Sequence, residues 1–259
     1  MIRNVLAIAD LRGHVKMLEP LAARCREYNC EAILIAGNIF TPGLRAEEWE
    51  RALAQGRAPA AQEAELHREE EQNSQVLDIF LDWLGKLEIP AFIIPGVLDA
   101  PERLFVQGVV DHASISPRVA LVHRGFAWLG SQHVVAGFGG RVTESRREAY
   151  WAVEYPSWEA EFGLEFMRQF EQRRILLLHS VPAGVPGSAG EPAAVLADLI
   201  KMHTPEIVVC APPDHDAGSI HIGTSLVVWP GQLHEGHYAV IDLRERTAVF
   251  GKLAEAAVA

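Results

Sequence analysis

The chain opens with a short apolar run that ends in a polar turn, NVLAIADLRGH at residues 4–14. Residues 5–9 are all apolar, which is typical of a strand buried on both faces, and Asp10 closes the run. Apolar residues at helical spacing follow over 15–22, and a second apolar run occupies 32–36. The order strand, helix, strand predicts a β-α-β unit and places the chain in the α/β class.

Similar patterns recur along the chain. A further amphipathic helix is predicted at 75–87, and further buried strands at 91–94, 175–178 and 207–210. Two groups of apolar runs separated by turn residues, at 119–138 and 220–251, predict antiparallel strands. We therefore expect a two-sheet β-sandwich flanked by helices, in four layers ordered α/β/β/α. A three-layer doubly wound fold is the alternative, and the strand-rich C-terminal part fits it poorly.

The length and the net charge of the chain indicate its number of domains and exclude some classes of partner. The 259 residues favour one domain, 1–259, with a charged helical insertion at about 41–73 that is rich in glutamate. The 23 Lys and Arg against 34 Asp and Glu give a net charge of −11. That charge argues against a nucleic-acid backbone or an anionic membrane surface as a partner.

The cysteines and the apolar runs indicate a location. Cys25, Cys30 and Cys210 are odd in number and lack metal-finger spacing, so a disulfide framework is not expected. No apolar run reaches the length of a membrane span, and the first ten residues do not form a signal peptide. We expect a cytoplasmic protein.

Polar or glycine-bearing turns follow five of the predicted strands. In α/β folds the loops at the carboxyl ends of the strands carry the functional site. These turns occupy 9–14, 36–40, 95–100, 179–182 and 211–216. We expect them to meet at one edge of the molecule and to form the site.

The order of these turns resembles the motifs of the calcineurin-like metallophosphoesterases: Asp-x-His, Gly-Asp, Gly-Asn-His-Asp/Glu, His and Gly-His-x-His. The resemblance covers nearly the whole chain and includes Val-Trp-Pro-Gly at 228–231, which is similar to the family's Asn-Pro-Gly turn. It implies the two-sheet fold and phosphoester chemistry. It also implies two metal ions that generate a hydroxide and hold the phosphoryl group.

Compared residue by residue, most of the ligand positions differ from the family pattern. Asp10 and His179 match, whereas Arg12 replaces a histidine and Asn38 replaces the bridging aspartate. The third motif keeps its glycine and its acid but loses its asparagine and its catalytic histidine, as the residues Gly96, Val97, Leu98 and Asp99 show. The fifth motif, at 211–214, has neither histidine. The resemblance therefore implies a dinuclear site that is largely lost, and we assign no catalytic residue.

Arg12 is the most informative of these differences. A permanent positive charge beside Asp10 repels a divalent cation at short range. Three roles stay open for Arg12: a salt bridge to Asp10 without a ligand, a bidentate contact with a phosphate or carboxylate, or a place on the surface. The candidates for binding an anion are Arg12, Asn38 and His179. The candidates for holding a single metal ion, Mn or Zn, are Asp10, Asn38, His179, Asp214 and His215.

Three functions follow from these residues. The first is a phosphoesterase-like protein without catalysis or cofactor, which binds a small phosphorylated ligand, another anion or a protein partner. The second is an active phosphoester hydrolase that uses one divalent metal ion. The third is a structural role, as in a homo-oligomer, with the cleft closed by the Arg12–Asp10 pair and by Trp229.

Overall fold

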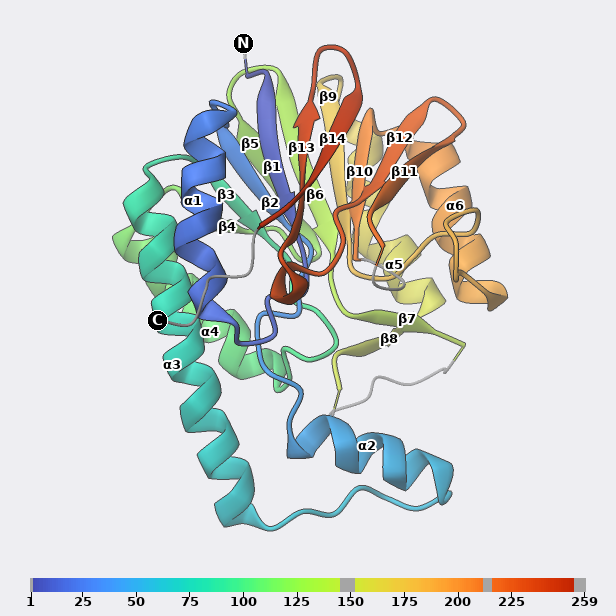
Figure 1. Ribbon diagram of the computed structural model, residues 1–259. Helices are drawn as coiled ribbons and strands as arrows, with labels where there is room; N and C mark the ends of the chain where they lie inside the picture. The colour runs from blue at the N-terminus through green and yellow to red at the C-terminus, as the bar shows by residue number, and fades with distance from the viewer. Residues whose placement is uncertain (1, 145–151, 212–215, 254–259) are drawn as a thin grey trace.

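The computed structural model describes residues 2–144, 152–211 and 216–253 (Figure 1). Two six-stranded sheets form its centre. The first has the order β14-β13-β1-β2-β3-β4 and the second has the order β11-β12-β10-β9-β6-β5. A third, two-stranded sheet joins β7 (Arg141–Thr143) to β8 (Glu154–Pro156).

The first sheet mixes parallel and antiparallel strands. Strands β1 to β4 run parallel to one another. Strand β13 lies beside β1 and is antiparallel to it, and β14 is antiparallel to β13. Its strands are β1 (Asn4–Ile8), β2 (Ala32–Ile35), β3 (Ala91–Ile93), β4 (Val119–Leu121), β13 (His237–Asp242) and β14 (Thr247–Lys252).

The second sheet has the same mixed character. Strands β6, β9, β10 and β12 run parallel, and β5 and β11 are antiparallel edge strands. Its strands are β5 (Gly125–Leu129), β6 (His133–Phe138), β9 (Arg173–Leu178), β10 (Ile207–Cys210), β11 (Gly218–Ile222) and β12 (Ser225–Trp229).

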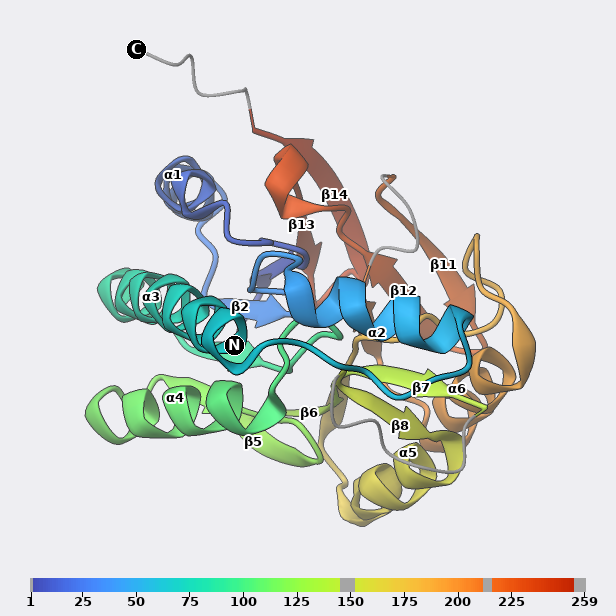
Figure 2. The same cartoon turned by 90° about the horizontal axis from the view of Figure 1, so that it is seen from below.

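Helices cover the outer face of each sheet (Figure 2). Helices α1 (Leu18–Glu27), α3 (Glu63–Leu87) and α4 (Glu102–Ile115) pack on the first sheet. Helices α5 (Ser157–Leu164) and α6 (Gly190–His203) pack on the second. Single 3-10 turns lie at η1 (Val15–Met17), η2 (Glu165–Gln169) and η3 (Leu233–Glu235).

Successive side chains along a central strand face opposite sides of its sheet, so each strand contributes to two layers of the core. On β1, Val5 and Ala7 face the core between the sheets, where Ile175 of β9 also lies, whereas Leu6 and Ile8 face the helices. Because both faces of the central strands are buried, their sequences are apolar throughout. The predicted α/β/β/α sandwich is confirmed.

Both predicted groups of antiparallel strands, 119–138 and 220–251, are divided between the two six-stranded sheets. Strand β4 is parallel to β3 in the first sheet, and β6 is parallel to β9 in the second. Only β5 and β6 form an antiparallel pair within 119–138, so the antiparallel prediction was wrong for β4. Likewise β11 and β12 belong to the second sheet and β13 and β14 to the first. Apolar runs and turn residues mark strands but do not encode which strand each one pairs with.

The charged segment forms two helices. Helix α2 (Leu44–Ala54) lies at the lower end of the sandwich, and α3 begins at Glu63 after a loop (Figure 1). Helix α3 continues without a break to Leu87, so the last part of the charged segment, from Glu63, and the helix predicted at 75–87 are one element. Within the described residues we find no helix whose length and apolar character suit a membrane span.

Candidate functional site

The first two strand-end loops interlock at the carboxyl edge of the first sheet. The backbone N–H of Asp10 donates to Gly37 O, and that of Arg12 donates to Asn38 O, both at 3.0 Å. Asp10, Arg12 and Asn38 have φ values of 57°, 47° and 59°. Aspartate and asparagine tolerate this left-handed conformation, but arginine rarely adopts it, and such strain is common at functional sites.

Both oxygens of the Asp10 carboxylate have partners. Arg12 Nη2 donates to Oδ2 at 2.8 Å, and Asn38 Nδ2 donates to Oδ1 at 2.7 Å. Asp10 is buried, whereas the Arg12 side chain is 29% exposed. The carboxylate is therefore neutralised by a guanidinium from its own loop and fixed by an amide from the next loop.

Asn38 is held in one orientation by its two contacts. Its Nδ2 faces Asp10, and its Oδ1 accepts the backbone N–H of Leu98 at 2.9 Å. The amide oxygen is thus occupied by the loop after β3. Gly96 makes this approach possible, because a Cβ there would lie 2.3 Å from Asn38 Oδ1.

Asp99 ties the same loops together from beneath. Its fully buried carboxylate accepts the backbone N–H groups of Gly96, Asn38, Ile39 and Phe40 at 2.6 to 3.0 Å. Burial raises the pKa of Asp99 to about 6, and the four hydrogen bonds oppose that rise. Asp99 therefore positions the loop that carries Asn38 and does not face a ligand.

His179 lies at the end of β9, in the second sheet. Its Nδ1 is 2.7 Å from Ala36 O, which brings it to the loop after β2 in the first sheet. Burial lowers the pKa of His179, Asp10 opposes this effect, and the positive charges of Arg141 and Arg12 add to it. The structure thus brings together four of the predicted site residues, Asp10, Arg12, Asn38 and His179.

These four residues line one open cavity of about 390 Å³, which we call the strand-end cavity. Its far wall includes Ser188, Ala189 and Pro192 at the N-terminus of α6. Arg141, which follows the Gly139-Gly140 turn after β6, also lines it. Arg141 is half exposed and pairs with Glu154 at 3.1 Å.

Arg141 was not among the predicted site residues. The strand before it was expected within an antiparallel group at 119–138, whereas β6 also lies parallel to β9 and ends beside His179. The paired glycines at 139 and 140 are the signal that could have marked a strand end. A Cβ at Gly139 would lie 2.4 Å from the Pro95 carbonyl oxygen, so the turn needs glycine there.

The remaining predicted residues do not join the strand-end cavity. Asp214 and His215 lie outside the described residues, so the structure places neither of them. Trp229 is buried in the second sheet's helix-facing core and packs over Gly218, where a Cβ would lie 2.5 Å from its ring. Trp229 therefore has a packing role in its own sheet, and the closure of the cleft by Trp229 that the structural hypothesis requires is not found in the described part of the chain.

The described residues do not fit a dinuclear metal centre. Among them, we find no cluster of three or more His, Cys, Asp or Glu side chains with the arrangement of a metal site. The carboxylate of Asp10 is engaged by two donors, and the amide oxygen of Asn38 accepts a backbone N–H. The bridging position thus holds a neutral group whose nitrogen, not its oxygen, faces Asp10.

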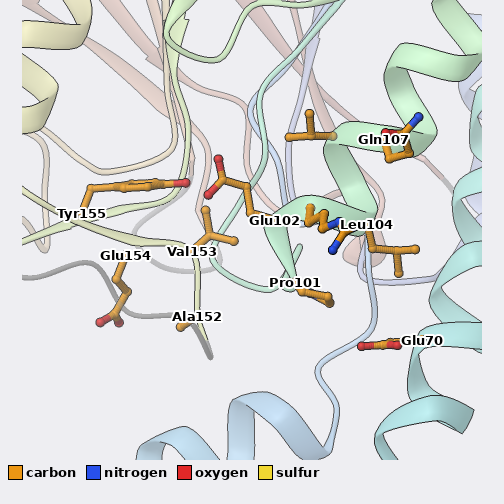
Figure 3. A pocket seen from close by; sticks show the side chains of 11 residues that line it. Glu70, Pro101, Glu102, Leu104, Gln107, Ala152, Val153, Glu154 and Tyr155 are labelled. Atoms are coloured by element: carbon orange, nitrogen blue, oxygen red, sulfur yellow. The ribbon is translucent and has the colours of Figure 1, made fainter.

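A second cavity, of about 810 Å³, lies at the start of α4 (Figure 3). In it, the carboxylate of Glu102 and the hydroxyl of Tyr155 point toward one another, and His123 Nε2 lies 3.4 Å from Glu102. None of the predicted site residues lines this cavity. The strand-end cavity is therefore the candidate site.

The comparisons with known proteins place the chain in a family. Residues 1–253 match the family model described as metallophosphoesterase, calcineurin superfamily. Members of this family typically depend on divalent metal ions. No curated protein sequence matches.

Solved structures agree in fold. One crystal structure is 28% identical with a TM-score of 0.87, over 98% of this chain and 100% of the other. The protein TT1561 of Thermus thermophilus is 25% identical with a TM-score of 0.80, over the same shares of the two chains, 98% and 100%. A dimetal phosphatase from Danio rerio is 10% identical with a TM-score of 0.60, over 98% of this chain and 99% of the other, and shows the fold alone. The chain belongs to the calcineurin superfamily of metallophosphoesterases.

Proposed function

We propose that this protein binds the phosphate group of a small ligand, or a similar oxyanion, in the strand-end cavity and does not hydrolyse it. The observation that carries the proposal is the Arg12–Asp10 pair. Arg12 supplies a fixed positive charge where the family places a metal-binding histidine, and its partner carboxylate has no free oxygen. A guanidinium holds phosphate directly, without a metal ion.

Arg12 keeps donors that its bond to Asp10 does not use. Only its Nη2 contacts the carboxylate, and its buried Nε has no hydrogen-bond partner in the described part of the chain. A buried N–H without a partner costs free energy that a bound oxyanion recovers. This unsatisfied donor supports a ligand beside Arg12.

The other walls of the strand-end cavity also favour a negatively charged ligand. Arg141 also lines it, and the 14-residue helix α6 begins there. The helix dipole places partial positive charge at that N-terminus, and no side chain among the described residues caps it. Asp10 offsets Arg12 and Glu154 offsets Arg141, so the support from these walls is two guanidinium groups with unused donors and the partial positive charge of α6.

Calorimetric titration with phosphate after chelator treatment tests the proposal. We expect saturable binding that weakens about tenfold or more in Arg12→Lys, which keeps the charge but loses the planar fork, and in Arg141→Ala. Arg103→Ala, at the second cavity, is the control and leaves binding unchanged. Absence of phosphate binding, or binding unaffected by Arg141→Ala, contradicts the proposal.

The second candidate is a phosphoester hydrolase with one metal ion, as the family's metal dependence favours. Its support is His179, whose ring lines the cavity and whose Nε2 has no hydrogen bond to any of the residues that the structure describes. This candidate predicts phosphodiester hydrolysis that needs Mn or Zn and disappears in His179→Ala. Hydrolysis that persists in chelator contradicts it.

The location is part of the proposal. Cys25, Cys30 and Cys210 are all unpaired and buried. Unpaired thiols are typical of proteins in a reducing compartment, which supports the cytoplasm.

A further inference from the structure

The hydrogen bond to Ala36 fixes the tautomer of His179. The ring is more than nine-tenths buried, and Nδ1 lies 2.7 Å from the Ala36 carbonyl oxygen. A carbonyl oxygen only accepts hydrogen bonds, so Nδ1 carries the hydrogen. In a neutral imidazole the other nitrogen, Nε2, then holds a lone pair.

An imidazole is mostly uncharged at neutral pH, so the hydrogen bond from Nδ1 to Ala36 O determines that Nε2 is an acceptor. Within the described residues, Nε2 has no hydrogen-bond partner, and His179 lines the strand-end cavity. The cavity wall therefore presents an acceptor nitrogen beside the guanidinium donors of Arg12 and Arg141.

This acceptor conflicts with a fully deprotonated oxyanion. Arg12 and Arg141 attract the anionic oxygens, but an oxygen beside Nε2 would set one lone pair against another. A sulfate ion cannot relieve this conflict, because none of its oxygens carries a hydrogen at neutral pH. Hydrogen phosphate can, because its P–OH donates to Nε2.

We propose that the strand-end cavity selects an oxyanion that carries its own O–H donor, and that His179 Nε2 accepts that hydrogen bond. The inference rests on the proposed function and names its ligand class. The O–H is either that of hydrogen phosphate itself or a hydroxyl on the organic part of a phosphate ester. Ligand binding removes water from Nε2, so a ligand without a donor leaves this acceptor unpaired and binds more weakly.

A matched pair of variants isolates the acceptor. In His179→Asn the side-chain amide reaches the position of Nδ1, so it can still donate to Ala36 O, but nothing occupies the position of Nε2. In His179→Gln the terminal amide reaches the position of Nε2 and offers its oxygen there. Thermal melting of both variants confirms that they fold.

Calorimetric titrations with phosphate and sulfate at neutral pH give the readout. We expect the wild type to prefer phosphate over sulfate by about tenfold or more, His179→Asn to bind both about equally, and His179→Gln to regain part of the preference. If the wild type binds both ions equally, or if the preference survives in His179→Asn, this inference fails while the proposed anion site stands. If the wild type binds neither ion, both fail.

Two further measurements identify which group of the ligand supplies the O–H and whether His179 takes up a proton. At about pH 8.5 a phosphate monoester has lost its second proton, so glycerol 3-phosphate keeps only its hydroxyls and methyl phosphate has none. Tighter binding of glycerol 3-phosphate there assigns the donor to the organic part. Equal binding of the two esters, both weaker than inorganic hydrogen phosphate, assigns it to the P–OH group. Uptake of about one proton on sulfate binding, measured in two buffers, would show that His179 becomes a donor and would overturn the inference.

Discussion

Arg12 Nη2 lies 2.8 Å from Asp10 Oδ2, and this contact joins the first and third residues of the turn that resembles the family's Asp-x-His motif. The pair is asymmetric, because the carboxylate is buried while the guanidinium is partly exposed to the strand-end cavity. A buried charge needs a partner, and here a residue two positions along the same loop supplies it. The loop thus carries its own counter-charge for Asp10.

Removing this carboxylate should destabilise the fold. Asp10→Ala leaves Asn38 Nδ2 and Arg12 without their acceptor, and we expect a loss of about 2 kcal/mol in the free energy of unfolding. Urea denaturation measures it. The control is Asp198→Ala, which removes an exposed partner of Lys201 on α6 and should cost less than about 0.5 kcal/mol. Equal losses would show that the buried pair does not stabilise the loops.

Asp99 should give stability a particular pH dependence. Its folded pKa of about 6 lies above the ordinary value of 3.8, so the folded state binds the proton more tightly than the unfolded state. The contribution of Asp99 to stability therefore increases as pH falls from about 6 toward about 4 and is lost as pH rises through about 6.

The comparison with Asp99→Asn isolates this contribution from other carboxylates. We expect the difference in unfolding free energy, wild type minus variant, to increase in favour of the wild type between about pH 6.5 and about pH 4. Urea denaturation across that range measures it. A difference that does not change with pH would contradict the raised pKa.

Gly96 should not tolerate a side chain. A Cβ there would lie 2.2 Å from Asn38 N, and the loops after β2 and β3 would separate. We expect Gly96→Ala to lose about 1 to 3 kcal/mol of stability and to weaken phosphate binding. The matched control is Gly85→Ala within α3, where the nearest atom is 3.8 Å away, and it should gain about 0.5 to 1 kcal/mol. Calorimetric melting of both variants tests the contrast.

Metal loading should distinguish the two candidate functions. We expect wild-type protein that is loaded with Mn and Zn and then desalted to retain almost no metal, because Asp10 and Asn38 are engaged. The double variant Arg12→His with Asn38→Asp removes the competing charge and adds an anionic bridge, so it should retain more. Mass spectrometry gives the metal content per chain. About one ion per wild-type chain, lost in His179→Ala, would favour the single-metal hydrolase.

Local sequence predicted much of the candidate site. Asp10, Asn38 and His179 each follow an apolar run directly, and parallel strands bring their carboxyl ends to one edge. The replacement of a histidine by Arg12 was also visible, because it falls within a recognisable motif. These inferences needed only the order of residues along single strands.

The sequence by itself predicted the central strands of both large sheets, the four layers and the loops that carry the site, because burial on two faces imposes an unbroken apolar pattern that can be read locally. It did not predict β7 and β8. Only the tertiary structure decided that β6 lies beside β9, which brings Arg141 to the cavity, and that α3 is one continuous helix. It also decided that His179 Nδ1 meets Ala36 O, across 143 residues and between two sheets. Strand pairing and the direction of a buried hydrogen bond depend on partners distant in the sequence, and no local pattern records those partners.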